Sequence, residues 1–307
     1  MLNANRVKNL FLFLFLVVAF GCKKDPEVIP DNPTPPYNKV PTVLIENYVN
    51  RIFIDLIGRE PLDAEMTKET KTMKDGNLDL ADRQALISKL QTNTDYIEGD
   101  SSYHNAYYNR MYDLAKVRVI EGASAAEINQ YLGIHISGMY IDSVSGDSLG
   151  VAEHRQEITK LQNVLDANND YQYGNIDIVD VFAIMINNQV YDIINMNTFN
   201  YINATFDDLF FRFPTSAEFY QAFDMIEYNL SSNLLGQPGQ NKGDYIEIVT
   251  TSREFHEGVI IWNYLTLLAR TPTSAEVDAE MSYFYSTHDM QKLQENIMVT
   301  DEYANIE

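Results

Sequence analysis

Two nearly identical heptads, "RFPTSAE" at residues 212–218 and "RTPTSAE" at residues 270–276, decide the fold that this sequence predicts. Apolar residues recur at three- and four-residue spacing before each heptad, which is typical of an amphipathic helix. Each proline disfavours helical backbone at the residue before it and is predicted to end that helix. A threonine followed three residues later by a glutamate is the capping box that begins a helix. Each heptad therefore predicts a helix, a corner and a second helix.

A third copy, "REPLDAE", stands at residues 59–65. Leu62 replaces the capping threonine there, so we expect Asp63 to cap the second helix. The arginine of each copy is predicted to lie in the last turn of the first helix, where a cation suits the exposed carbonyl groups. The corner residues assigned in this way are Arg59, Pro61, Glu65, Arg212, Pro214, Thr215, Glu218, Arg270, Pro272, Thr273 and Glu276.

A second motif follows each corner: "LQTNTDY" ending at Tyr96, "VTTSREF" ending at Phe255 and "MVTDEY" ending at Tyr303. "MINNQVY", ending at Tyr191, is a candidate degenerate copy. Recurrence of paired motifs is typical of a repeat protein whose units stack. The sequence thus predicts a mainly α-helical repeat array of helix–corner–helix units with an irregular insert. The predicted parts are a first repeat at 45–100, an insert at 101–180, and second and third repeats at 181–307.

The insert begins with another capping box, "SAAE" at residues 124–127. The following "GIHISGMYIDSVSGDSLG", at residues 133–150, is rich in glycine and serine and is predicted to form a hairpin or a long loop. Because insertions in repeat proteins often gather on a working face, we expect this insert to contact a partner.

The paired motifs resemble a loose family of exported bacterial helical repeats with the approximate consensus "LYxxLLGRxPxxxE" followed by "LxxSxEY". The "DLIGREP" copy also resembles a segment of planctomycete surface proteins linked to cytochromes, but no "CxxCH" haem site occurs in this sequence. Neither resemblance implies an established activity. Both imply a helical module used for assembly or recognition.

The chain begins with Arg6 and Lys8, the apolar run at 10–21, and then Cys22. Residues 1–21 therefore predict a secretory signal peptide. Its end, "VVAFGC", resembles the lipobox of bacterial lipoproteins, which implies cleavage before Cys22 and lipidation of that residue. A proline-rich linker is predicted over residues 22–44, and such linkers are extended. The "CKKD" start and the Asn-, Tyr- and Ile-rich body resemble lipoproteins of the Bacteroidota, which implies the outer membrane; the periplasmic and the exterior face both stay open.

The formal net charge of −22 argues against nucleic acid as a partner, because phosphate binding needs clustered lysine and arginine. It also disfavours direct adhesion to anionic lipid. Cys22 is the single cysteine, so no intramolecular disulfide is expected and the core depends on packing.

Two groups of residues suggest a catalytic or a metal-binding site, and each also has a plainer interpretation. "SGDSLG" matches the nucleophile-elbow pattern through Gly146, Ser148 and Gly150, but no buried apolar strand precedes it, which favours a surface turn. "DANNDYQYGNID" offers a weak calcium loop, against which stands a plain polar loop before a helix. The calcium candidates are Asp166, Asn168, Asp170 and Asp177.

Tyrosines at 103, 107, 108 and 112 form two i, i+4 pairs, so core packing is expected, with an aromatic patch for a partner or a glycan as the alternative. The histidines show no pair at ligand spacing, and we expect neither a metal nor another cofactor.

These observations predict a lipid-anchored accessory or scaffold subunit of an outer-membrane complex for import, secretion or outer-membrane protein assembly. It would act without catalysis, through contacts with an outer-membrane barrel or other envelope proteins. The alternative is a surface glycan- or peptide-binding lipoprotein, and a hydrolase using Ser148 is third.

Overall fold

The computed structural model describes residues 39–306, and the chain from Val40 onward forms one compact unit. The predicted signal peptide, the lipidation of Cys22 and most of the linker lie outside the described residues. Within residues 39–306, no helix combines the length and the apolar character needed to cross a membrane.

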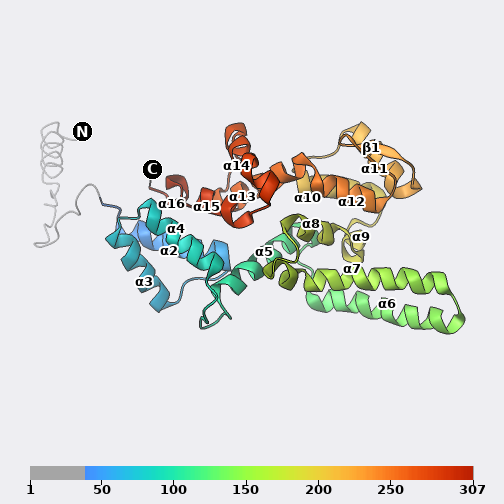
Figure 1. Cartoon of the computed structure of the whole chain (residues 1–307), viewed down its shortest axis with the longest axis horizontal. Helices are drawn as coiled ribbons and strands as arrows, with labels where there is room; N and C mark the ends of the chain where they lie inside the picture. The colour runs from blue at the N-terminus through green and yellow to red at the C-terminus, as the bar shows by residue number, and fades with distance from the viewer. Residues whose placement is uncertain (1–38, 307) are drawn as a thin grey trace, which may run out of the picture. The chain divides into compact units, whose positions relative to one another are not determined.

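The described chain is almost entirely helical, which confirms the mainly α prediction (Figure 1). Two short antiparallel strands, β1 (Ser232–Leu234) and β2 (Gln237–Gly239), pair with Ser232 opposite Gly239. The helices are α2 (Thr42–Ile57), α3 (Asp63–Asp75), α4 (Leu80–Thr92), α5 (Tyr103–Ile120), α6 (Ala125–Ser145), α7 (Ser148–Gln172), α8 (Ile178–Ile186), α9 (Gln189–Asn195), α10 (Thr198–Phe210), α11 (Ser216–Tyr228), α12 (Lys242–Thr251), α13 (Arg253–Leu268), α14 (Ser274–Thr287), α15 (Met290–Met298) and α16 (Asp301–Ala304).

The helices follow a recurring order of first helix, corner, second helix and third helix. The order is α2, α3 and α4 in one unit, α10, α11 and α12 in another, and α13, α14 and α15 in the last, with α16 after it. Helix α2 already begins at Thr42, after Pro41, so the linker was predicted three residues too long. Each second helix packs against its own first helix, which makes the corner the local organiser of the unit.

The insert is more regular than predicted and has one helix more than the other units. Helix α5 ends at Ile120, the following residue Glu121 has φ of 52°, and Ser124 and Glu127 form the capping box that begins α6. Helices α6 and α7 then form a long antiparallel pair, and α8 closes the unit.

The prediction of a hairpin or loop at residues 133–150 is wrong, because α6 runs to Ser145 and α7 begins at Ser148. The less exposed residues of α6 are Ile128, Tyr131, Leu132, His135, Gly138, Met139 and Asp142. Their three- and four-residue spacing is helical, and it outweighs the turn signal of the glycines and serines.

The last unit packs against the first, so the array is closed where a simple stack would leave two open ends. Helix α16 contacts α2, and α15 contacts α4 (Figure 1). The Tyr48 and Tyr303 rings meet edge to face with centroids 5.9 Å apart, and the Tyr48 hydroxyl donates to Met298 O at 3.2 Å. Arg83 adds hydrogen bonds to Val299 O and the Asp301 carboxylate.

The tyrosine run of α5 belongs to the core. Tyr103, Tyr107 and Tyr112 are buried, and Tyr108 is half-buried with its ring 4.8 Å from that of Tyr171. Core packing is therefore confirmed for this run, and its alternative role as an exposed aromatic patch is wrong.

Candidate functional site

The corners begin where a helix ends in the left-handed conformation. Gly58, Phe211 and Ala269 have φ of 77°, 57° and 55° and follow the last residues of α2, α10 and α13. Each helix therefore ends several residues before the proline of its corner. The arginine comes directly after the left-handed residue. Two predictions are corrected by this: proline does not terminate the helix, and the arginine is not in its last turn.

Arg212 shows what the corner arginine does. Its Nη1 and Nη2 donate to the two oxygens of Glu218 at 2.9 and 2.8 Å, and Glu218 in turn accepts from Thr215 N at 2.7 Å. Arg270 makes the same forked pair with Glu276 at 3.0 and 2.6 Å, and Arg59 with Glu65 at 2.7 and 2.9 Å. Such bidentate pairs are stronger and more geometrically specific than single ion pairs. The capping boxes at Thr215 and Thr273 are confirmed.

At the first corner Leu62 has no side-chain acceptor, and Asp63 is the first residue of α3 and does not cap it. The Glu65 carboxylate still accepts from Leu62 N at 2.7 Å, so half of the capping box remains. The Tyr103 hydroxyl donates to the same carboxylate at 2.6 Å.

Each arginine also binds an acid at or just before the start of the helix that follows its own unit. Arg212 binds Glu254, Arg270 binds Glu302 at 2.5 Å and Arg59 binds Asp100 at 2.8 Å. Glu254 and Glu302 belong to the second sequence motif, so the two motifs recur together because they touch. The corner arginine joins a unit to its successor.

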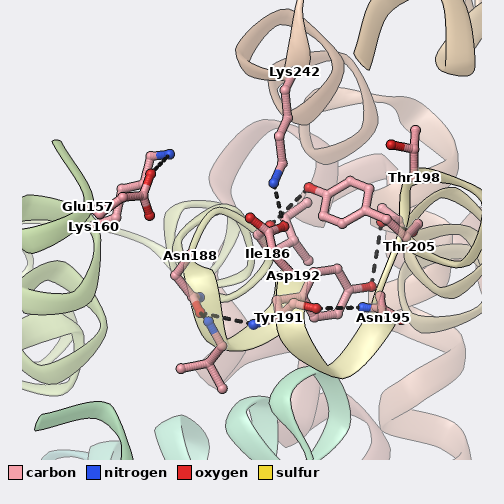
Figure 2. Close-up of polar contacts among 12 residues, drawn as sticks. Glu157, Lys160, Ile186, Asn188, Tyr191, Asp192, Asn195, Thr198, Thr205 and Lys242 are labelled. Atoms are coloured by element: carbon pink, nitrogen blue, oxygen red, sulfur yellow. Dashed lines mark hydrogen bonds and ion pairs between the residues drawn. The ribbon is translucent and has the colours of Figure 1, made fainter. Parts of the chain in front are cut away.

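The first copy of the second motif was aligned wrongly. Tyr96 is 80% exposed, whereas Tyr103 is buried and begins α5 after the capping residue Ser102. Residues 97–101 delay the helix start, so Asp100 and Tyr103 take the acidic and aromatic roles. The degenerate copy that ends at Tyr191 has the same structure as the other copies. Asn188 caps α9 by accepting from Val190 N at 2.9 Å, and Tyr191 is buried (Figure 2).

The corner glutamates titrate far below the ordinary glutamate range. Hydrogen bonds from Arg212 lower the pKa of Glu218 to about 2, and hydrogen bonds from Arg270 lower the pKa of Glu276 to about 2. At Glu65, burial raises the pKa, but hydrogen bonds from Arg59 and Tyr103 outweigh it, and the net pKa is lowered.

We expect acid to destabilise the protein through these glutamates. A depressed folded-state pKa contributes stability that is complete above the unfolded value of 4.5 and is lost as pH falls toward about 2. Glu218→Gln removes one such group, so between pH 7 and pH 3 its free energy of unfolding should fall by about 1–2 kcal/mol less than that of the wild type. Urea unfolding at both pH values measures this. Identical losses in both proteins would contradict the Arg212–Glu218 pair.

The α6–α7 hairpin presents an uncharged apolar face. No aspartate, glutamate, lysine or arginine stands between Glu127 and Asp142. Apart from α7, the main neighbour of α6 is α9, and the turn of the hairpin lies at its free end (Figure 1). The apolar residues of α6 exposed by between 48% and 73% are Ile134, Ile136, Tyr140, Ile141 and Val144. Exposed apolar residues gathered on one helix without a charged residue among most of them are typical of a protein–protein interface.

The "SGDSLG" motif is the turn of this hairpin, as expected for a surface turn. Gly146 ends α6 with φ of 80°, Asp147 caps α7 and Ser148 is exposed in its first turn. Within residues 39–306 Ser148 makes no hydrogen bond to a histidine, and a helix stands where a nucleophile elbow needs a strand.

The calcium candidates do not form a loop. Asp166, Asn168 and Asp170 lie in α7, because Val164, Ala167 and Tyr171 bury one face of the helix through Gln172. Asp177 caps α8 and accepts from His288 Nδ1 at 2.7 Å. Across residues 39–306, no three or more histidine, cysteine, aspartate and glutamate side chains are grouped to hold a metal ion.

A small polar hollow of about 230 Å³ lies where α9, α10 and α12 meet. Lys242 forms an ion pair with Asp192 there (Figure 2). Its Nζ also lies 4.4 Å from the centroid of the Tyr201 ring. Met196, at the rim, is highly exposed with φ of 63° and ψ of −32°, in a tight turn closed by Asn197 N donating to Asn195 O at 2.7 Å. Such backbone is strained. The aromatic side chains of Phe199 and Tyr228 are exposed on the adjoining helices.

Comparison with known proteins identifies no family for this chain. No protein-family model matches it, and no curated protein or solved structure matches it significantly. The α6 face was missed in the sequence, although the charge-free run between Glu127 and Asp142 is a signal that could have found it.

Proposed function

We propose that this protein is a lipid-anchored accessory or scaffold subunit of an outer-membrane complex, and that its partner binds the apolar face of α6. The observation that carries the proposal is the uncharged, exposed stripe of Ile134, Ile136, Tyr140, Ile141 and Val144. Anchoring at Cys22 rests on the lipobox resemblance. Import, secretion and outer-membrane protein assembly are the processes such a subunit serves.

The chemistry of the face favours a protein over a lipid surface. The chain carries a net charge of −22, which is repelled by anionic lipid headgroups. An apolar protein surface meets no such repulsion, because α6 itself is uncharged between Glu127 and Asp142. The partner is therefore expected to offer a matching apolar groove or helix.

The proposal is tested by placing charge on the face. In the double variant Ile141→Glu/Val144→Glu, capture of a stoichiometric envelope protein from native membranes in mild detergent should fall at least about tenfold. Burying two charges in an apolar contact costs more than the roughly 1.4 kcal/mol that a factor of ten represents. Mass spectrometry of the tagged, lipidated protein and its partners measures the loss.

The matched control is Val43→Glu/Leu80→Glu, which adds the same charge at exposed apolar residues in the first turns of α2 and α4. It should capture the partner as the wild type does. Equal capture by the α6 variant and the control would refute the assigned face.

A glycan- or peptide-binding lipoprotein is the second candidate, and the hollow between α9, α10 and α12 favours it. The polar groups of Asp192 and Lys242 and the apolar side chain of Met196 line it together, which suits a ligand with both an apolar face and hydrogen-bonding groups. If the wild type is recovered alone from native membranes and binds oligosaccharides on an array, this second function is favoured.

A further inference from the structure

Two histidines that stand 19 residues apart in the sequence meet across the α6–α7 hairpin. His135 on α6 and His154 on α7 face each other with their Nδ1 atoms 2.8 Å apart. Their ring centroids are 5.1 Å apart, and His135 is 9% exposed. No ligand spacing in the sequence marks this pair, because the register of the hairpin and not the local helix brings the two residues together.

The outer nitrogen of each ring faces an oxygen. His135 Nε2 lies 2.8 Å from Gln189 Oε1, and His154 Nε2 lies 3.4 Å from Asp142 Oδ2. An amide oxygen accepts hydrogen bonds and does not donate them, so His135 Nε2 carries the hydrogen, and the nearby Asp142 carboxylate favours the same form of His154. In neutral imidazole the other nitrogen then has a lone pair. The two Nδ1 lone pairs therefore face each other, and one cation, either a proton or a metal ion, fits between them.

We propose that His135 and His154 bind one divalent first-row transition-metal ion, of the Zn²⁺, Ni²⁺ or Cu²⁺ class, through their Nδ1 atoms. Imidazole nitrogen suits these ions. With metal–nitrogen bonds of about 2.0–2.1 Å, tetrahedral ligands stand about 3.3 Å apart, so the rings need to separate by only about 0.5 Å. Water completes the coordination.

The surroundings have the features of a prepared site. Metal-binding histidines usually donate their second N–H to a carboxylate or a carbonyl oxygen, which is the arrangement that Asp142 and Gln189 offer. Gly138 makes room for the His154 ring: a Cβ there would overlap Nε2 and lie 2.5 Å from Cε1.

The position of the pair gives the ion a structural consequence. Gln189 is the first residue of α9, so the site lies where the hairpin meets the rest of the unit, and Tyr140, Ile141 and Val144 lie beyond it toward the turn. A bound ion would fasten α6 to α7 at this level. This inference does not depend on the proposed function, because metal binding is measured without a partner.

The test is a titration of the full-length chain in detergent, stripped with chelator, with Zn²⁺ alone by calorimetry and Co²⁺ alone by visible absorption. We expect one ion per chain in the micromolar range. His154→Gln should weaken binding at least about tenfold, and Asp142→Asn, which leaves both rings in place, by about tenfold. The control His104→Gln changes a histidine that contacts Gln91 O elsewhere and should leave binding unchanged.

The proposal is overturned if neither ion binds up to millimolar concentration, or if both hairpin variants bind as tightly as His104→Gln does. Thermal melts of the metal-free variants show whether each is folded. If His154→Gln is not, Asp142→Asn decides the question alone. Histidine nitrogen NMR that shows a proton shared between the Nδ1 atoms and no change with Zn²⁺ also refutes the site.

Discussion

Replacing Gly258 with alanine is expected to lower the free energy of unfolding by at least about 3 kcal/mol. Gly258 lies in α13 where that helix crosses α10, and a Cβ there would overlap Leu209 O and lie 3.0 Å from the carbonyl carbon. The obstacle is helical backbone, which cannot rotate aside as a side chain does. At an unobstructed helical position, replacing glycine with alanine usually stabilises a protein by about 0.5–1 kcal/mol. At Gly258 the clash with Leu209 makes the same change destabilising.

The measurement is urea and thermal unfolding of Gly258→Ala beside Gly133→Ala. Gly133 is also helical, in α6, but a Cβ there would have no atom within 4 Å. The control should therefore gain about 0.5–1 kcal/mol while Gly258→Ala loses stability. If Gly258→Ala matched the wild type, the close crossing of α10 and α13 would be contradicted.

Arg212→Ala is expected to cost about 2–3 kcal/mol of unfolding free energy. The change leaves the carboxylates of Glu218 and Glu254 close together without their shared cation. The Arg212 side chain is 33% exposed and Glu218 17%, so the cost lies between the small value of a surface pair and the roughly 3–5 kcal/mol of a buried one. Arg212→Lys should recover part of the loss only, because an ammonium cannot reproduce the forked geometry.

Arg253→Ala serves as the control, since its side chain is 60% exposed and pairs with Glu257 one turn along α13. It should change stability by less than about 0.5 kcal/mol. A double-mutant cycle of Arg212→Ala with Glu254→Gln should show coupling, which tests the contact between successive units. A cost for Arg212→Ala no larger than that of Arg253→Ala would contradict the role of the corner.

The corners were readable from the sequence because capping chemistry is local. Thr215 and Glu218 are three residues apart, and their mutual hydrogen bonds need no distant partner. The second acid of each arginine was not readable, because Arg212 and Glu254 are 42 residues apart and meet only after the third helix of the unit has packed. The same dependence on packing explains why Tyr96 was preferred to Tyr103.

Helix ends and the hairpin were harder to predict for different reasons. The residue after the first helix has a left-handed backbone at all three corners, but only Gly58 is a glycine that signals it in the sequence. Phe211 and Ala269 give no such signal, so the ends of their helices were predicted too late. In α6, the glycines and serines suggested a turn, although the spacing from Ile128 to Asp142 is helical. The His135–His154 contact depends on the register of two long helices, which no local pattern records.

Closure of the array has a consequence for how the chain acquires its structure. The ring of Tyr48, near the start of α2, is covered by Tyr303 of α16, and Arg51 donates to Tyr303 O at 2.9 Å. A polypeptide is synthesised from its amino-terminal end, so the side of α2 that carries Tyr48 is covered only after α16 has been made. Contacts of such long sequence separation slow folding and make the units cooperative. The repeats are therefore not interchangeable modules: removing α16 uncovers the side of α2 against which Tyr303 packs.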